Sequence, residues 1–490
     1  MPYLQVVILH GWSDNSDSFK PLAQWLKENG HNTYSLMLGD YISLRDDVRI
    51  EDVAKRMEEV VVEKQRQGVL QRKFDLIVHS TGGLLARRWI ATHYADPQRN
   101  CPVRNLLMLA PANFGSKLAH MGRSMLGRVF KGWKTGFETG EEMLYALELS
   151  SPFQWALAQD DLFVTENSSS SKAFYGHDKV RPFVIVGTHP YPEFMAQITN
   201  ENGSDGTVRV AAANLNAYGM TVDFSGGNLL TPDVRPWKRR GRKGVQFPFA
   251  VLPDRTHGSV VHPEELGLAN QDQLGGLVLQ ALRVTGEAGY TKALSDWREV
   301  CETTRTLAGS STDAQDQRDE WFGKRAKTPR EYFHEYYQVF VRAEDEFGEE
   351  IPDYFISFMP KKKTFSLNRN VPRESGFFHQ EVLEDVHVHR ACRANRALFL
   401  DRFDIMDPRG GFYSRIRRDQ PRGLQFTVTA ADPGDRIAYF THSKIGKRGL
   451  VDLHQEIPKD KRWLKRHSTH FLRVIVPRAG KDEIFKLKRG

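Results

Sequence analysis

The chain has 490 residues, of which 40% are hydrophobic and 27% are charged. A single domain typically holds ~100–200 residues, so this length predicts two domains, or one large domain with an appendage, and the composition excludes disorder throughout. The three cysteines, Cys101, Cys301 and Cys392, form no CxxC pair. A disulfide framework and a cysteine zinc site are therefore not expected. We expect the protein to work in a reducing compartment.

The formal net charge of +8 is concentrated in one part of the chain. Residues 361–490 carry 29 Lys and Arg against 15 Asp and Glu, whereas residues 1–330 carry 39 against 38. Such asymmetry indicates an anionic partner. We expect an anionic membrane surface to bind 361–490 and expect no nucleic acid, because no nucleic-acid-binding motif accompanies the charge.

No apolar run approaches the ~18–20 residues that span a bilayer. The apolar stretch Tyr3–Leu9 has no basic segment before it and no cleavage site after it, so we predict a buried strand rather than a signal peptide. The expected location is the cytoplasm or the periphery of a membrane, with export by a route that needs no signal peptide left open.

Residues 1–290 alternate short apolar runs with amphipathic stretches, which predicts an α/β fold with a mostly parallel sheet and helices on both faces. The predicted elements are strands at Gln5–Leu9, Phe74–Val78, Val103–Leu109, Arg181–Gly187 and Phe247–Leu252, with helices at Ser18–Asn29, Asp52–Gln67 and Gly83–His93.

The composition changes after residue 290. Residues 291–330 are interpreted as a helical and charged linker, polar from Ala308 to Arg330, and 331–490 as a β-rich, sandwich-like basic accessory domain. Its predicted strands are Tyr337–Arg342, Tyr354–Phe358, Ala397–Phe403, Leu424–Thr429, Arg436–Thr441 and Phe471–Val476.

The segment Phe74–Arg88 contains the most informative motif. A buried strand runs into Ser80, and a helix follows after Gly82 and Gly83. This order predicts a nucleophile elbow, a sharp turn that exposes the serine hydroxyl above the sheet. The usual glycine two positions before the serine is Val78 here, which leaves the tightness of the turn open.

A serine hydroxyl needs a base that a carboxylate orients, and this fold carries them in the chain order Ser, Asp or Glu, His. Asp205 and His257 each lie in a turn after a predicted strand, where ligands bind in open α/β sheets. Ser80, Asp205 and His257 are therefore the candidate catalytic residues. The competing residues are His262 and His189 as bases and Asp254 as the acid.

The predicted oxyanion hole consists of the Trp12 N–H, after the first strand, and the Thr81 N–H, next to the nucleophile. Together with the candidate triad and oxyanion hole, the motifs of residues 1 to about 290 resemble those of the lipase-like serine esterases of the α/β-hydrolase superfamily, including bacterial lipases and GPI inositol-deacylase-like proteins. The residues that carry the resemblance are His10-Gly11, His79-Ser80-Thr81-Gly82-Gly83, Leu109–Ser116, Ser204-Asp205-Gly206 and His257-Gly258. The resemblance implies hydrolysis of carboxylic esters, including lipid esters, by the triad and without a cofactor.

An insertion at about 114–177 is long enough to form a lid. Helical periodicity from Ser116 to Trp133 places Met121, Met125, Phe130 and Trp133 on one apolar face. This face is predicted to cover the substrate or to contact lipid, and a cap helix packed on the sheet is the alternative.

Two polar clusters have open interpretations. The run Arg235–Lys243 holds six basic residues, which suit a solvated loop or phosphate head groups. His387 and His389 alternate near Glu384 and Asp385, which favours an exposed strand face over metal ligation, and no metal site is expected. The predicted function is lipid ester hydrolysis. The alternatives are an inactive hydrolase-fold protein that binds a membrane or a partner, or a thioesterase or amidase.

Overall fold

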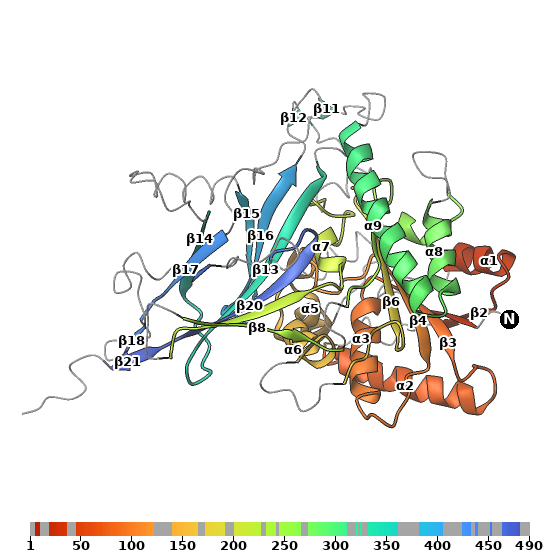
Figure 1. Ribbon diagram of the computed structural model, residues 1–490, viewed down its shortest axis with the longest axis horizontal. Coiled ribbons are helices and arrows are strands. Elements are labelled where there is room, and N and C mark those ends of the chain that lie inside the picture. Colours follow the sequence, from red (N-terminus) through yellow and green to blue (C-terminus); the bar gives the residue numbers. More distant parts are fainter. Residues whose placement is uncertain are drawn as a thin grey trace, which may run out of the picture. The chain divides into compact units, whose positions relative to one another are not determined.

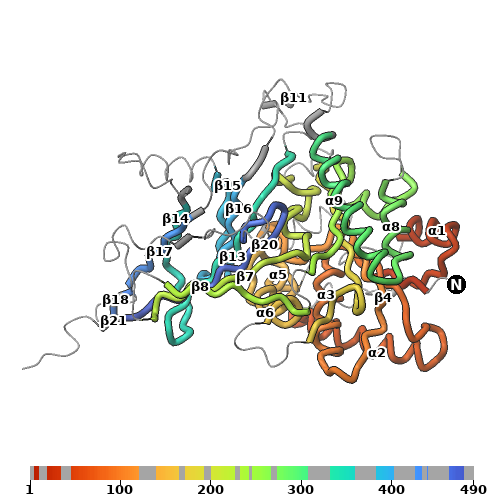
Figure 2. The backbone as a smooth tube through the Cα atoms, viewed as in Figure 1, coloured from red at the N-terminus to blue at the C-terminus, as the bar shows by residue number. Residues whose placement is uncertain are grey.

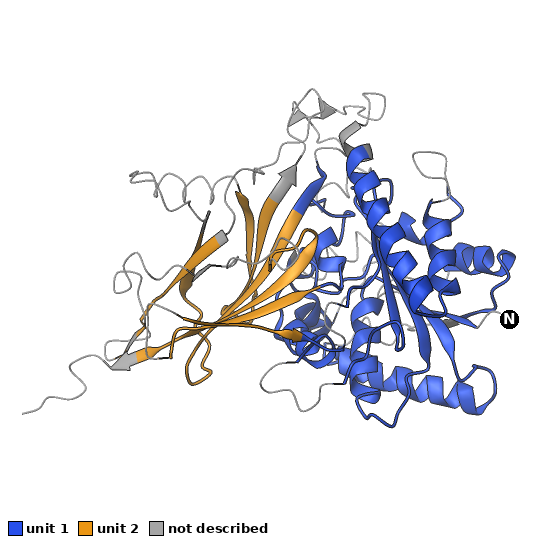
Figure 3. Cartoon of the chain, in the orientation of Figure 1, with its two compact units in different colours: residues 1–216, 239–335, 404–413 blue, residues 217–238, 336–403, 414–490 orange. Residues whose placement is uncertain are grey.

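The computed structural model describes residues 5–9, 19–36, 46–121, 140–164, 172–191, 200–226, 232–241, 245–265, 273–310, 320–321, 324–325, 332–360, 382–404, 424–432, 437–439, 451–452 and 463–480. These residues divide into two compact units (Figure 3). Unit 1 contains residues 1–216, 239–335 and 404–413, and unit 2 contains 217–238, 336–403 and 414–490. Among the described residues, no helix combines the length and the apolarity that crossing a membrane requires.

Unit 1 is built on a six-stranded sheet in the order β10-β6-β4-β3-β1-β2, and every neighbouring pair is parallel. The strands are β1 Val6–Leu9, β2 Thr33–Leu36, β3 Phe74–His79, β4 Val103–Leu109, β6 Arg181–Gly187 and β10 Phe249–Leu252. Most of their side chains are apolar and buried, because helices cover both faces (Figure 1). The predicted α/β fold and its parallel sheet are confirmed.

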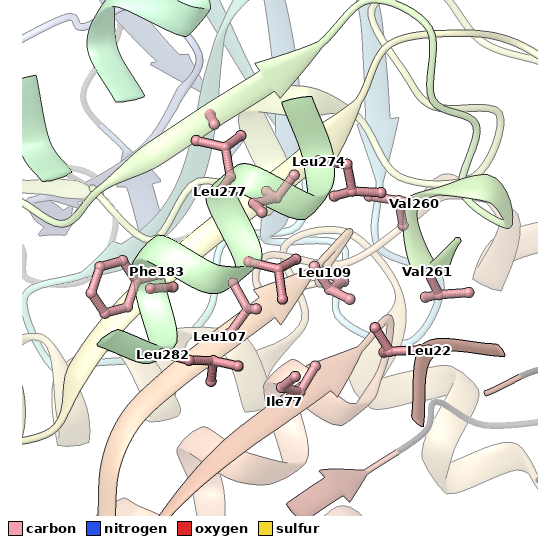
Figure 4. Packing of buried hydrophobic residues seen from close by; sticks show 14 of the residues in the cluster. Leu22, Ile77, Leu107, Leu109, Phe183, Val260, Val261, Leu274, Leu277 and Leu282 are labelled. Atoms are coloured by element: carbon pink, nitrogen blue, oxygen red, sulfur yellow. The ribbon is translucent and has the colours of Figure 1, made fainter. Parts of the chain in front are cut away.

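One face of this sheet packs against α1 Lys20–Glu28, α8 Gln273–Arg283 and α9 Glu287–Ser310, and α2 Ile50–Arg66 packs on α3 Gly82–His93 at the other. Figure 4 shows the first interface, where Leu22 of α1 and Leu274 of α8 meet Ile77 and Leu107 from the strands. All four side chains are at most 1% exposed. Burial of a leucine or isoleucine side chain contributes roughly 1.5–3 kcal/mol, so this layer holds the strand ends in fixed positions.

Helix α9 begins inside the hydrolase sequence and continues well into the segment interpreted as a linker. Its Ala293 and Trp297 are fully buried against the sheet, and the Trp297 indole N–H donates to the Gln280 side chain at 2.7 Å. Residues 291–306 thus pack as part of unit 1, because the helix has an apolar stripe that the polar composition around it obscures. Residues 311–319 and 326–331 lie outside the described residues.

Short elements connect this core. They are η2 Lys117–Met121, α5 Glu141–Leu147, α6 Pro152–Asp161, β5 Phe163–Val164, α7 Val210–Ala213, β9 Lys238–Arg239, η4 Ser259–Val261, β11 Glu320–Trp321 and β12 Lys324–Arg325.

Unit 2 is β-rich, as predicted. A six-stranded sheet in the order β15-β16-β13-β20-β7-β8 shares one apolar core with a three-stranded sheet in the order β14-β17-β19. The strands are β7 Tyr218–Asp223, β8 Asp233–Pro236, β13 His334–Asp345, β14 Tyr354–Pro360, β15 Leu383–Val388, β16 Asn395–Asp404, β17 Leu424–Ala430, β18 Ile437–Tyr439, β19 Val451–Asp452, β20 Ser468–Val476 and β21 Arg478–Gly480.

Strands β7 and β8 come from the part of the sequence that was assigned to the hydrolase domain. β7 pairs in parallel with β20, with Tyr218 opposite His470 and Val222 opposite Val474. Residues 217–238 thus belong to unit 2, and in Figure 2 the yellow-green tube of β7 runs beside the blue tube of β20. The sequence gives no sign of it, because strand pairing between segments 250 residues apart leaves no local pattern.

Candidate active site

The turn between β3 and α3 places Ser80 at the carboxyl end of the sheet. Ser80 has φ 53°, in the left-handed region that a residue other than glycine rarely occupies. Its backbone N–H donates to the Leu109 carbonyl and its own carbonyl accepts the Ala112 N–H, both at 3.1 Å. These bonds tie the strained turn to β4 and the loop that follows it. Backbone strain of this kind is typical of a functional turn.

Close packing behind the serine requires a glycine at position 83. A Cβ on Gly83 would lie 2.7 Å from Cβ of Pro111, far inside a normal contact. Val78, where a glycine is usual, is a fully buried residue of β3 paired with Leu9 and Met108. The turn therefore forms with valine at position 78. The small residue that it requires is Gly83, after the serine.

Asp205 lies in the buried turn after β6 and is fully shielded from solvent. Its Oδ1 accepts the backbone N–H groups of Thr207 at 3.0 Å and Val208 at 2.8 Å. Gly206 has φ +95°, and a Cβ there would overlap the Tyr191 ring. The turn thus fixes the carboxylate through one oxygen and leaves Oδ2 free to bind another group.

His257 follows β10 and completes a continuous chain of hydrogen bonds. Its Nδ1 lies 2.9 Å from Asp205 Oδ2 and its Nε2 lies 3.1 Å from Ser80 Oγ. All three residues are at most 4% exposed. Because the carboxylate can only accept, Nδ1 carries the hydrogen and Nε2 faces the hydroxyl with a lone pair. This is the geometry that a hydroxyl nucleophile and its base require.

The competing residues lie elsewhere. His262 pairs with Glu264, with 3.2 Å between Nδ1 and Oε1. Burial lowers the pKa of His189, whose backbone N–H donates to the Arg255 carbonyl. Asp254 lies 3.9 Å from the Arg255 guanidinium. Among the described contacts, His257 is the histidine that reaches Ser80 Oγ, and Asp205 is the carboxylate that reaches its ring.

Thr81, one of the two predicted oxyanion donors, follows Ser80 directly and is the residue before the first turn of α3. The partial positive charge of a helix N-terminus favours negative charge at this point. The other predicted donor, Trp12, lies outside the described residues.

Most of the predicted lid also lies outside the described residues: this holds for Met125, Phe130 and Trp133. Met121 is the last residue of η2, and the structure describes its backbone alone. The described remainder of the insertion includes α5 and α6. Leu144 of α5 and Trp155 of α6 are buried.

A buried ion pair that the sequence analysis missed attaches α6 to the nucleophile helix. Arg87 of α3 donates to both Asp161 carboxylate oxygens, at 2.8 and 3.0 Å, and to the Asn113 carbonyl at 2.7 Å. Burial opposes a charge on Arg87, but the Asp161 carboxylate raises the pKa of the guanidinium above its ordinary value. The signal in the sequence was Arg87 itself, a charged residue at a position of α3 that is flanked by Leu84, Leu85 and Ile90.

Three arginines of the basic run Arg235–Lys243 have internal partners. Arg235 pairs with Asp223 at 2.9 Å, Arg239 donates to the Val245 carbonyl at 2.9 Å, and Arg240 donates to the Gln159 carbonyl at 3.0 Å. The interpretation of this run as a freely solvated loop is therefore wrong for these three residues. Arg242 and Lys243 lie outside the described residues.

The two histidines of β15 and the following turn are buried, not exposed as expected. His387 is 5% exposed and His389 is fully buried, with Nδ1 accepting the Cys392 N–H at 3.0 Å. Glu384 accepts the Tyr336 hydroxyl at 2.6 Å. The prediction of an exposed strand face is wrong for these two histidines, because the side of β15 that carries His387 faces the interior.

A parallel sheet, a strained serine between strand and helix, and a buried Ser–His–Asp chain together define the α/β-hydrolase fold. The profile of the palmitoyl protein thioesterase family matches residues 5–209. A search of curated proteins found no match. The resemblance to lipase-like α/β-hydrolases that the sequence suggested is confirmed.

Solved structures extend the likeness to the whole chain. Phospholipase PlaB from Legionella pneumophila is 22% identical, with 100% of this chain and 96% of that chain covered and a TM-score of 0.76. The same protein in complex with thio-NAD is 23% identical, with 99% and 96% covered and a TM-score of 0.72. At this identity the likeness shows the fold, and it includes both units.

Proposed function

We propose that the protein is a serine hydrolase that cleaves carboxylic esters of lipids. The observation that carries the proposal is the buried chain from Ser80 Oγ through both ring nitrogens of His257 to Asp205, with contacts of 3.1 and 2.9 Å. A phospholipid is the first substrate class to examine, because the fold likeness to a protein described as a phospholipase spans both units.

In the proposed reaction, Ser80 Oγ attacks the ester carbonyl carbon while its proton moves to His257 Nε2. Asp205 holds the imidazole in the required orientation and stabilises the imidazolium. The N–H groups of Thr81 and Trp12 bind the oxyanion, where one such donor is worth ~3 kcal/mol. His257 then gives its proton to the departing alcohol, which leaves an acyl-Ser80 intermediate. Water then attacks that acyl group while His257 Nε2 takes its proton. The bond between the acyl carbon and Oγ breaks, His257 returns the proton to Oγ, and the fatty acid leaves.

Fluorophosphonate labelling and ester turnover test this proposal. The wild type should label at Ser80 and hydrolyse a short p-nitrophenyl ester, and Ser80→Ala should do neither. Ser225→Ala is the matched control, since Ser225 bonds Asp223 in unit 2 and should leave both signals intact. Labelling that persists in Ser80→Ala would disprove the assignment of the nucleophile.

A thioester hydrolase is the second candidate, because the thioesterase profile covers the nucleophile and acid segments. The same triad serves all acyl transfers, so the leaving group decides between the candidates. A panel of phospholipid, triacylglycerol, p-nitrophenyl ester and palmitoyl thioester separates them by kcat/KM. A highest value for the palmitoyl thioester would favour the second candidate.

The basic segment 361–490 supports a further part of the proposal, docking on an anionic membrane surface. Each Lys or Arg near such a surface contributes about 1 kcal/mol, and salt screens the attraction. Flotation with anionic and with neutral vesicles at low and high salt provides the test. Equal binding to both vesicles, unchanged by salt, would contradict it and would indicate apolar rather than electrostatic contact with lipid.

A further inference from the structure

The main chain of His257 is held by two hydrogen bonds that the triad scheme does not use. Its backbone N–H donates to the Asp205 carbonyl at 2.8 Å, and its carbonyl oxygen lies 2.9 Å from Nε2 of His79. The residue next to the nucleophile and the acid itself thus each hold the backbone of the base. A carbonyl oxygen only accepts, so Nε2 of His79 carries the hydrogen.

His79 is well placed for this contact. It is the last residue of β3, is 3% exposed, and precedes Ser80 directly. Its ring lies between two others, with centroids 5.6 Å from Phe19 and 4.7 Å from His257. Packing from both sides leaves the imidazole little freedom, which makes its donor a rigid one.

The base loop, residues 253–259 after β10, makes other hydrogen bonds that do not connect His257 to β3. Thr256 and Ser259 bond each other through backbone and side-chain atoms, which closes the loop on itself. The His189 N–H reaches the loop at the Arg255 carbonyl, two residues before His257. The bond from His79 joins the main chain of His257 directly to β3, the strand that leads into Ser80.

We infer that His79 is a positioning residue that sets the reach from His257 Nε2 to Ser80 Oγ. The inference rests on the proposed function. During catalysis, His257 Nε2 takes the proton of Ser80 Oγ and then gives it to the departing alcohol, so the ring must stay within hydrogen-bond reach of Oγ throughout. The hydrogen bond from His79 keeps the base loop close to Ser80, because His257 and Ser80 are then both attached to the C-terminal end of β3.

Two substitutions of similar size separate the hydrogen bond from the packing. In His79→Gln, the side-chain amide nitrogen can reach the place of Nε2 and donate to the same carbonyl. His79→Met fills comparable space and has no donor, which leaves the buried carbonyl of His257 without this partner. Thr304→Val is the matched control, since it removes a buried hydrogen bond from Thr304 to the Val251 carbonyl of β10 without touching His79.

Steady-state kinetics with a soluble p-nitrophenyl ester, well below each variant's Tm, gives the first test. His79→Met should lower kcat by ~10- to 100-fold with KM nearly unchanged, as small misplacements of reacting groups do. His79→Gln should restore most of this loss, and Thr304→Val should lower Tm without lowering kcat. Equal kcat in His79→Met and wild type, a His79→Gln enzyme as slow as His79→Met, or an equal loss in Thr304→Val would overturn the inference.

A measurement without turnover separates this inference from the proposed function. Nitrogen NMR of 15N-histidine protein, recorded for wild type and for Ser80→Ala, should show His79 protonated at Nε2 in both. Signals of His257 should shift in His79→Met and return in His79→Gln. An unprotonated Nε2 on His79 would overturn the inference even in an active enzyme, whereas a protonated Nε2 in a protein with no Ser80-dependent turnover would reject only the proposed function.

Discussion

Each unit contains a buried histidine that uses both ring nitrogens, and the partners differ. In unit 1, His257 lies between the Asp205 carboxylate and the Ser80 hydroxyl. In unit 2, His470 of β20 lies 3.0 Å from the Gln338 carbonyl through Nδ1 and accepts the Lys465 N–H at 2.9 Å through Nε2. The first ring has a side chain with a transferable proton on one side and an anion on the other. The two nitrogens of the second ring contact backbone groups, an arrangement that stabilises the fold.

The largest expected effect comes from changing the anion beside the first ring. Asp205→Asn keeps the shape of the turn, but the amide can donate to Nδ1 and so favour the wrong tautomer. We expect kcat to fall by ~10⁴-fold with little change in Tm. Steady-state kinetics and thermal unfolding measure both. A loss of less than tenfold would mean that Asp205 does not orient the base.

Removing the second ring should have the opposite profile. His470→Ala removes one hydrogen-bond partner each from the buried Gln338 carbonyl and the half-buried Lys465 N–H and opens a cavity, so the free energy of unfolding should fall by about 2–4 kcal/mol. Turnover measured well below Tm should stay at the wild-type value. Urea unfolding and kinetics of the same preparation test this, and a large loss of kcat in a folded variant would contradict the comparison.

A smaller effect should follow from crowding the nucleophile turn. Gly83→Ala forces Pro111 and the Ser80 turn apart by several tenths of an ångström, and we expect kcat to fall about tenfold. Gly276→Ala on α8 is the control, because nothing lies within 4 Å of a Cβ there. That variant should gain up to about 1 kcal/mol of stability with unchanged kcat. Equal kcat in the two variants would show that the close approach behind Ser80 is dispensable.

The smallest effect concerns pH and a histidine outside the site. Burial, together with Arg283 and Arg104, lowers the pKa of His31 below its usual value. The unfolded chain therefore takes up a proton below about pH 6.5 while folded His31 stays neutral. The contribution of His31 to the free energy of unfolding is therefore highest above pH 6.5. It declines as the pH falls toward the lower pKa of the folded state. Urea unfolding at pH 7.5 and 5.5 should show a smaller pH dependence for His31→Gln than for wild type.

The sequence was sufficient for the parallel sheet and for the order of the three candidate catalytic residues. Apolar strands such as Val103–Leu109 are local signals, and a site at strand ends follows from the fold. The contacts of His79 and Arg87 could not be predicted, because each depends on which distant backbone atom lies opposite a side chain. For the same reason the pairing of β7 with β20 escaped detection.

That pairing has a consequence for how the chain is made. β7 leaves the ribosome soon after the Asp205 turn, but its neighbour β20 is synthesised almost 250 residues later. At ~5–20 residues per second, β7 waits on the order of ten seconds or more with an unpaired edge. Such an edge invites pairing with other chains. A ribosome that stalls before residue 468 would thus release a product whose hydrolase sequence is complete but whose β7 is exposed, a ready substrate for chaperones or proteases.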